Sequence, residues 1–265
     1  MGRIANTLSA AKIIGLSYLD HSGPRFIPPK LDDKGREILE AVKSKGYYVW
    51  KGFYTRETCQ ELIKEVDTLI ERKRGLKVYD DSDIRIYAGH KYSDKINSFN
   101  KNELLNDVAE NFLGMRATAF FTLSAKITYK EGNLGSGQGW HRDTYRPFQF
   151  KAMVYLTDVD EASGPFELIE GSHTKFSLIE YAAKNDIPPN QHRFTEKEVE
   201  VLSRGKERRI FVGNAGDLII FNSYCIHRGA PLKSGFRYAL TNYYYPIHVI
   251  ERNRESLEKK FNLNG

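Results

Sequence analysis

The spacing of apolar residues divides the chain into a helical first part and a strand-rich second part. Apolar side chains recur at helical spacing in three segments, which begin near Asp32, Thr55 and Asn102. Residues of these types accept a hydrogen bond from the first helical turn and thereby favour a helix start. From about Thr118 the pattern changes to short β-prone runs. It predicts strands at 47–50, 83–87, 118–129, 149–156, 166–169, 210–212, 217–221 and 236–245.

Helices followed by many short strands indicate an α+β or mainly β chain, in which the helices pack outside a closed or double sheet. The length of 265 residues suits one domain of this class. We expect a single domain over 31–250, with a helical part at 31–115 and the sheet core at 116–246.

Four polar segments fall outside this pattern. Residues 1–30 show no clear period and contain three prolines, so we expect an irregular N-terminal arm. Residues 251–265 are expected to form a C-terminal tail. The stretches at 173–209 and 89–100 are long and polar enough to close over a site as lids. The first of these is predicted to be an inserted loop with some helix.

The composition is that of a soluble globular protein, with 40% hydrophobic and 28% charged residues. No apolar run reaches the length of a membrane span and no signal peptide is evident, so we expect no membrane partner and a cytoplasmic location. Cys59 and Cys225 lie in apolar patterns, which favours buried thiols over a disulfide or a zinc site. The net charge of +6 is compatible with nucleic acid, a membrane surface or an anionic small-molecule substrate. It is modest and mixed in sign, so we interpret it as a solvated surface, with an anionic substrate as the alternative, and expect no nucleic-acid partner.

The chemistry is concentrated in the stretch Gly-Trp-His-Arg-Asp-Thr at 139–144. His141 and Asp143 are two residues apart, so an extended backbone places both side chains on one face. His227 is the best candidate for a third ligand. Two imidazoles and one carboxylate form the facial triad of non-haem Fe(II) oxygenases, which leaves open positions for a bidentate co-substrate and dioxygen. Arg237 follows on the next predicted strand and can anchor a dicarboxylate.

A His-x-Asp pair alone is more often a surface or structural feature than a metal site. The distal histidine and the spaced arginine shift the balance toward a metal centre. The histidines at 21, 173, 192 and 248 have no comparable partners in the sequence, and we interpret them as structural residues.

Several separated blocks of sequence accompany this motif. They are Gly46-Tyr47-Tyr48-Val49, Phe53-Tyr54-Thr55, Trp140-His141-x-Asp143, the run at 153–159, Ser163-Gly164-Pro165-Phe166-Glu167, Gly171-Ser172-His173, and the run at 215–221 leading into His227-Arg228-Gly229-Ala230-Pro231 and Arg237. In this order the blocks resemble the phytanoyl-CoA dioxygenase family of Fe(II)- and 2-oxoglutarate-dependent oxygenases.

The resemblance implies a double-stranded β-helix, the cupin-like jelly roll, with N-terminal helices packed outside. It implies that His141, Asp143 and His227 bind iron, and that Arg237 forms a salt bridge with the C5 carboxylate of 2-oxoglutarate. These residue types suit their implied partners, because neutral imidazoles and one carboxylate bind Fe(II) and a guanidinium grips a carboxylate through two hydrogen bonds.

Two further positions are implied as contacts of 2-oxoglutarate. Ser124 and Thr128, on the strand at 118–129, resemble places from which relatives hydrogen-bond the keto acid. Some relatives also carry a serine two residues past the second histidine. This chain has Gly229 there, so that contact comes from elsewhere or is absent.

The implied reaction is the oxidative decarboxylation of 2-oxoglutarate to succinate and CO2, coupled to hydroxylation of an unactivated C–H bond. Retention of Asp143 favours hydroxylation, because related halogenases lack this carboxylate; desaturation and ring formation would use the same residues. Tyr145, Arg146 and His90 are predicted to contact the substrate. The net charge and Arg146 favour a small anionic or sugar-like metabolite.

Two other functions use the same residues. A catalytically silent relative would bind a metal or ligand on the same jelly roll, although the intact triad and Arg237 argue against it. A nucleic-acid demethylase with the same iron chemistry would need a basic groove with stacking aromatic side chains, and the sequence shows only short basic clusters.

Overall fold

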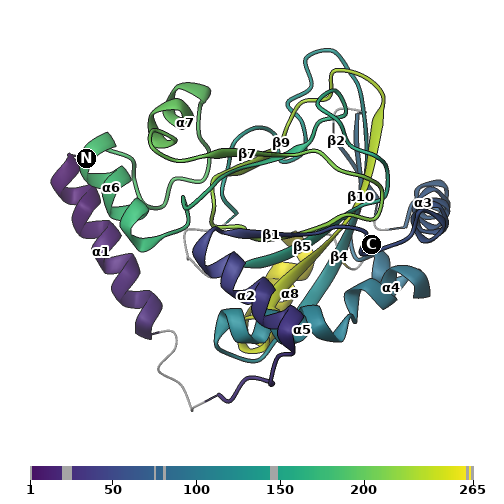
Figure 1. Cartoon of the computed structure of the whole chain (residues 1–265), viewed down its shortest axis with the longest axis horizontal. Helices are drawn as coiled ribbons and strands as arrows, with labels where there is room; N and C mark the ends of the chain where they lie inside the picture. Colours follow the sequence, from purple (N-terminus) through teal and green to yellow (C-terminus); the bar gives the residue numbers. More distant parts are fainter. Residues whose placement is uncertain are drawn as a thin grey trace.

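The computed structural model describes residues 2–19, 26–74, 76–79, 82–143, 149–260 and 263. Two antiparallel sheets face each other across a cavity (Figure 1). The large sheet has the order β1-β8-β5-β10-β4-β3-β2, and the small sheet has the order β7-β6-β9. This arrangement of two sheets with helices outside confirms the predicted jelly roll.

The strands of the large sheet are β1 (Tyr47–Trp50), β2 (Leu76–Tyr79), β3 (Asp83–Ile86), β4 (Ala117–Thr128), β5 (Phe150–Tyr155), β8 (Leu218–Asn222) and β10 (Phe236–Pro246). Those of the small sheet are β6 (Phe166–Ile169), β7 (Arg208–Phe211) and β9 (His227–Gly229). The longest pairing joins β4 to β10, and it forms the floor of the cavity.

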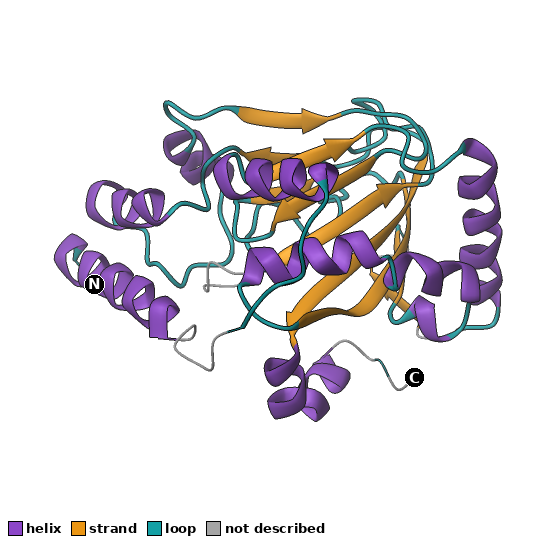
Figure 2. Ribbon diagram, turned by 60° about the horizontal axis from the view of Figure 1, so that its bottom comes forward, coloured by secondary structure: helices purple, strands orange, loops and turns teal. Residues whose placement is uncertain are grey.

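Four helices cover the outer face of the large sheet (Figure 2). They are α2 (Asp33–Ser44), α3 (Arg56–Glu71), α4 (Asp94–Asn100) and α5 (Glu103–Leu113). Asp32, Thr55 and Asn102 each accept a hydrogen bond from a backbone N–H three residues on, which confirms the three predicted helix starts. No helix in the described ranges combines the length and the apolar character that a bilayer crossing requires.

The N-terminal segment differs from the irregular arm expected over 1–30. Residues Arg3–Leu19 form helix α1, which packs on α6 (Lys175–Asn185) beside the small sheet (Figure 1). Ala10 is fully buried there, and Asn6 donates a hydrogen bond to the Asp186 carboxylate at 2.8 Å. The prolines in this segment all follow the helix, so they limit its extent without preventing it.

The predicted lid at 173–209 and the predicted tail at 251–265 are also more helical than expected. The first contains α6 and α7 (Glu196–Leu202), and β7 begins within it. Helix α7 starts with a capping box between Thr195 and Glu198, which satisfies two backbone N–H groups. At the C-terminus, α8 (Ile247–Lys260) follows β10 directly, so little of the described tail is irregular.

The polar stretch at 89–100 is not a mobile lid but part of the packed outer layer. It forms the 3-10 helix η1 (Gly89–Lys91) and helix α4. Ile96 and Phe99 are fully buried against the large sheet, because their spacing places both on one helical face. Burial of these two apolar residues keeps the stretch packed on the sheet, although most of its residues are polar.

A buried network of hydrogen bonds joins helix α4 to strands β4 and β10 of the large sheet. Asn242 donates to the Phe99 carbonyl at 2.8 Å and accepts from the Thr122 hydroxyl at 2.6 Å. Asn100 donates to the same hydroxyl oxygen at 3.0 Å. All three polar side chains are buried, so water cannot replace the hydrogen bonds that they lose.

Replacement of Asn242 by Leu tests this network. The variant leaves the Phe99 carbonyl and the Thr122 hydroxyl without their partner, and we expect the free energy of unfolding to fall by about 2–3 kcal/mol. Urea denaturation provides the measurement. Asn190→Leu, at an exposed position in the turn after α6, is the control and should change stability much less. Equal losses in the two variants would contradict the role of the network.

His90 generates a prediction about pH. Its Nδ1 accepts a hydrogen bond from the Thr122 backbone N–H at 3.3 Å, where β4 continues past the end of β3. Burial, reinforced by Lys91 and Lys101, lowers the pKa of His90 from 6.5 to about 4. The unfolded chain therefore takes up a proton at a higher pH than the folded chain, and stability is lost as the pH falls from about 6.5 to about 4.

His90→Asn keeps an acceptor for the Thr122 N–H and removes the titrating group. We expect this variant to lose less stability than wild type between about pH 7 and about pH 5, as measured by urea unfolding at both values. His248→Asn, at an exposed position, should retain the wild-type pH dependence. A wild-type pH dependence in His90→Asn would refute the assignment.

Candidate active site

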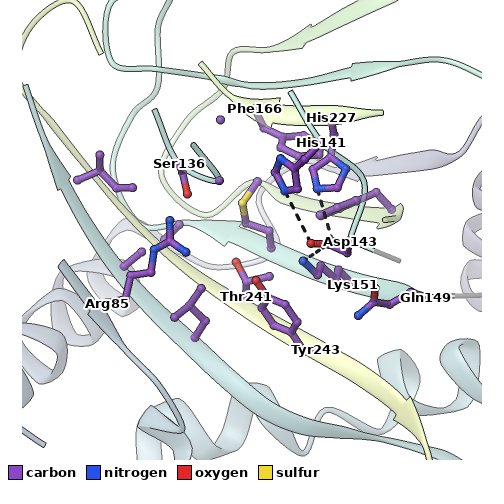
Figure 3. Close-up of a pocket in the computed structure, with 18 of the residues that line it drawn as sticks. Arg85, Ser136, His141, Asp143, Gln149, Lys151, Phe166, His227, Thr241 and Tyr243 are labelled. Atoms are coloured by element: carbon purple, nitrogen blue, oxygen red, sulfur yellow. Dashed lines mark ion pairs between the residues drawn. The ribbon is translucent and has the colours of Figure 1, made fainter. Parts of the chain in front are cut away.

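The cavity between the sheets has a volume of about 250 Å³ and is open at one side. Inward-facing residues of β3, β4, β5 and β10 line it from the large sheet, and residues of β6 and β9 close it from the small sheet. Figure 3 shows that polar side chains from both sheets point into this space. The cavity is therefore a single chamber that side chains from distant parts of the sequence share.

Three candidate metal ligands meet at one wall of the cavity. His141, Asp143 and His227 present ligand atoms that all lie within 4.8 Å of one another. The Asp143 Oδ1 atom is 3.7 Å from His141 Nε2, and its Oδ2 atom is 3.5 Å from His227 Nε2 (Figure 3). The structure thus brings together the three residues that the sequence motif singled out.

The backbone positions the two histidines. The His141 N–H donates to the His227 carbonyl at 2.9 Å, and the His227 N–H donates back to the His141 carbonyl at 2.8 Å. Each ring also has its Nδ1 within hydrogen-bond distance of a carbonyl, that of Gly139 for His141 and that of Cys225 for His227. A carbonyl can only accept, so Nδ1 carries the proton and the Nε2 lone pair faces Asp143.

Burial sets the protonation states of this cluster. It lowers the pKa of His141 and takes that of His227 to about 3, so both rings are neutral at pH 7. For Asp143, burial acts to raise the pKa, but Lys151 and then the two histidines together hold it below its usual range. Two neutral imidazoles and one carboxylate are the protonation states that a divalent metal requires.

Gly137, in the glycine-rich loop before the motif, lies against the ring of His141. Its backbone has φ +86°, and a Cβ atom there would lie 2.3 Å from Cε1 of the His141 ring. Any side chain would push the ring out of place, in addition to the strain of the left-handed backbone. The glycine lets the loop cover His141 closely.

Arg237 lies in the same cavity, on β10. Its side chain is buried, and neither Nε nor Nη1 has a hydrogen-bond partner among the described residues. Unpartnered N–H groups on a buried guanidinium suit a carboxylate ligand, which accepts charge-assisted hydrogen bonds from them. A Cβ atom at Gly229 would lie 3.0 Å from Arg237 Nη2, so the glycine leaves room for the arginine.

Ser124 and Thr128 do not reach the cavity. Alternation along β4 turns Leu123, Ala125 and Ile127 inward and places the two hydroxyl residues on the opposite face. The Ser124 hydroxyl is instead buried next to Gly89 and has no hydrogen-bond partner among the described residues. The structure therefore does not support these two positions as contacts of 2-oxoglutarate.

Of the three predicted substrate contacts, the structure describes only His90. His90 lies in the outer layer, where it accepts the Thr122 N–H, and it does not line the cavity. Tyr145 and Arg146 lie outside the described residues. The expectation for His90 fails because the stretch around it packs under the sheet instead of covering the cavity mouth.

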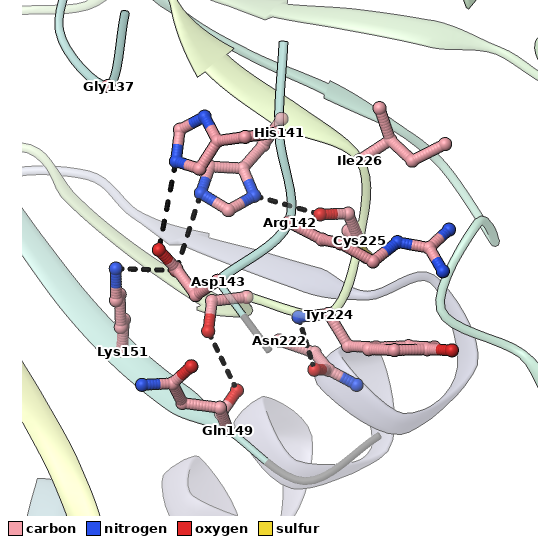
Figure 4. Close-up of polar contacts among 12 residues, drawn as sticks. Gly137, His141, Arg142, Asp143, Gln149, Lys151, Asn222, Tyr224, Cys225 and Ile226 are labelled. Carbon is pink, nitrogen blue, oxygen red and sulfur yellow. Dashed lines mark hydrogen bonds and ion pairs between the residues drawn. The ribbon is translucent and has the colours of Figure 1, made fainter. Parts of the chain in front are cut away.

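Sequence reasoning missed nine polar residues that line the cavity, namely Arg85, Tyr87, Ser136, Gln149, Lys151, Arg193, Thr241, Tyr243 and Tyr245. Alternation from Arg237 along β10 would have identified the last three. Lys151 stands in an otherwise apolar strand, and its Nζ forms an ion pair with Asp143 Oδ2 at 2.6 Å (Figure 4). A lysine in such a strand is itself a signal of a buried polar partner.

The pattern of the family extends over most of the chain. The family model described as phytanoyl-CoA dioxygenase (PhyH) matches residues 42–239, which include the candidate metal ligands and Arg237. A comparison with the curated proteins gives no match.

Solved structures share the fold at low sequence identity. EctD from S. alaskensis in its apoform is 18% identical, with a TM-score of 0.63, over 86% of this chain and 83% of that chain. The α-ketoglutarate-dependent carbocyclase SnoK from nogalamycin biosynthesis is 16% identical, with a TM-score of 0.62, over 84% and 87%. HygX from Streptomyces hygroscopicus, with nickel and 2-oxoglutarate bound, is 15% identical, with a TM-score of 0.57, over 80% and 87%.

The family match, the jelly roll and the donor set at its centre agree with one another. The match includes both histidines, Asp143 and Arg237, and the fold places all four side chains in one cavity. The chain belongs to the phytanoyl-CoA dioxygenase family of Fe(II)- and 2-oxoglutarate-dependent oxygenases.

Proposed function

We propose that the protein hydroxylates a C–H bond of a small anionic or sugar-like metabolite and converts 2-oxoglutarate and dioxygen to succinate and CO2 in the same cycle. One observation carries this proposal. The cluster of His141, Asp143 and His227 opens into a cavity that also holds the Arg237 guanidinium, with two N–H groups unpartnered among the described residues. A metal and a dicarboxylate would each find donors of the right chemistry there.

In this assignment the residues of the chain bind the metal, orient 2-oxoglutarate and exclude water from the site. His141, Asp143 and His227 bind Fe(II), and Arg237 grips the C5 carboxylate of 2-oxoglutarate. Bound iron and keto acid supply the oxidising chemistry for C–H hydroxylation. The Phe166 ring packs against His227 with a centroid separation of 5.5 Å, and this contact helps to exclude water behind the ligand.

The charges that line the cavity support an anionic substrate. The lining contains Arg85, Lys151, Arg193 and Arg237, and its one carboxylate among the described residues is Asp143. Asp83 offsets the charge of Arg85 through a buried ion pair. A doubly charged metal and a doubly charged keto acid cancel each other, so positive charge remains for an anionic substrate group.

The size of the cavity and the bound states of similar structures support a small molecule. A volume of about 250 Å³ leaves little space beside a keto acid. The epimerase SnoN has been determined with nogalamycin RO, and HygX with hygromycin B. Hydroxyl groups of Thr241 and Tyr243 face the same space, where they can hydrogen-bond a hydroxylated substrate (Figure 3).

Loss of a metal ligand should abolish metal binding without unfolding the domain. We expect His141→Ala, His227→Ala and Asp143→Gly each to weaken Fe(II) binding by more than about 100-fold, because even an outer partner of a ligand contributes 10–100-fold. Anaerobic titration of Fe(II) and 2-oxoglutarate, followed by the metal-to-ligand absorption band, measures the effect while circular dichroism checks the fold. A full band in any folded variant would sink the assignment of that ligand.

Arg237→Lys tests the anchor for 2-oxoglutarate separately. Lysine keeps the charge but loses the two parallel hydrogen bonds, so binding of 2-oxoglutarate should weaken by about 1.5–3 kcal/mol. Titration of 2-oxoglutarate against the Fe(II)-loaded protein gives this value. Arg56→Lys, in an exposed ion pair with Asp158, is the control and should bind as wild type does. A collapse of iron binding with normal keto-acid affinity would reverse the two roles.

Succinate release, screened against paired neutral and anionic metabolites, tests the activity itself. The proposed function requires release that depends on a metabolite, with anionic members preferred. A wild-type protein that binds Fe(II) and 2-oxoglutarate but never releases succinate would instead be a silent binding relative.

A further inference from the structure

Lys151 forms an ion pair with one of the candidate metal ligands, Asp143. Its side chain is buried in β5, and Nζ lies 2.6 Å from Asp143 Oδ2. In Figure 3 the lysine approaches Asp143 from the large sheet, whereas the rings of His141 and His227 approach from the other side. The carboxylate is therefore held between a cation and two imidazoles.

Tyr243 fixes the lysine in place. It is the direct cross-strand partner of Lys151 on β10, and Lys151 Nζ lies 3.8 Å from the centre of its ring. A desolvated ammonium group over an aromatic ring gains an attraction of its own. Lys151 Nζ thus contacts both the Tyr243 ring and the Asp143 carboxylate, and its side chain is buried.

The carboxylate of Asp143 has two oxygens that face the histidines. Oδ1 is 3.7 Å from His141 Nε2 and Oδ2 is 3.5 Å from His227 Nε2. A carboxylate in this orientation can bind one cation through both oxygens, as carboxylates do in many metal sites. Chelation by Asp143 would occupy a fourth coordination position and leave one position fewer for other ligands.

We propose that Lys151 is a positioning residue that engages Asp143 Oδ2 and so restricts Asp143 to metal binding through Oδ1 alone. The consequence is that three coordination positions stay available, which a bidentate keto acid and a diatomic ligand together require. This inference rests on the proposed iron and 2-oxoglutarate function. The inference goes beyond that function because it names the residue that keeps the third coordination position of the metal free.

The test uses Lys151→Met, which keeps the length of the side chain and removes the charge. Nitric oxide is the probe, because it binds Fe(II) at the position that dioxygen would use and gives an electron paramagnetic resonance signal. With Fe(II) and 2-oxoglutarate bound under anaerobic conditions, we expect nitric oxide binding to weaken by about tenfold or more, because chelation by Asp143 would take the coordination position that nitric oxide needs. Iron affinity should equal or exceed that of wild type, because Asp143 can then use both oxygens.

Two further variants complete the design. Lys126→Met is the matched control, since Lys126 also pairs with an aspartate, Asp67 at 3.2 Å, and lies over a tyrosine ring, but it does not line the cavity. It should bind nitric oxide as wild type does. Lys151→Arg retains a cation and should restore most of the signal that Lys151→Met loses.

Normal nitric oxide binding in Lys151→Met would overturn the proposal, and so would a loss of iron affinity, which would give Lys151 a role in retaining the metal. Should Lys151→Met fail to fold, the metal-loaded crystal structure of wild type decides. One bound oxygen, with Oδ2 on Lys151, supports the proposal, and two bound oxygens refute it. A wild-type protein that binds neither iron nor 2-oxoglutarate would refute the proposed function itself, which is a separate result.

Discussion

The reciprocal backbone hydrogen bonds between His141 and His227 are the contact on which the rest of the site depends. They join a loop that leads to the large sheet with a short strand of the small sheet, at the edge where the two sheets approach. Each residue donates one backbone hydrogen bond to the other and accepts one from it. The centroids of the two imidazole rings lie 4.3 Å apart. Asp143 follows His141 in the same loop, and Lys151 completes the site from β5 of the large sheet.

The sequence predicted the centre of the site well and its walls poorly. His141, Asp143, His227 and Arg237 could be predicted because the spacing of their residue types carries a chemical meaning. The remaining walls depend on which face of each strand turns inward, and a shift of one residue exchanges the faces. The family resemblance placed Ser124 against 2-oxoglutarate, although its neighbours Leu123 and Ala125 are the residues that line the cavity.

Some helices could be predicted from the sequence and others could not. The helix starts at Asp32, Thr55 and Asn102 could be predicted because capping is local and leaves a signature in the sequence. Helix α1 and helix α4 could not, because their stability comes from tertiary packing, on α6 and on the large sheet respectively. In both cases a few apolar residues in a polar segment gain their partners only when distant parts of the chain assemble.

The excess of cationic side chains around the cavity has a kinetic consequence. Arg85, Lys151, Arg193 and Arg237 line the cavity, and Asp83 and Asp143 offset the charges of Arg85 and Lys151. We expect the remaining positive charge to raise the local concentration of anions and so to accelerate the encounter with a dianion such as 2-oxoglutarate. Salt screens this long-range attraction and leaves the buried contacts largely intact. Ionic strength should therefore slow association far more than it speeds release.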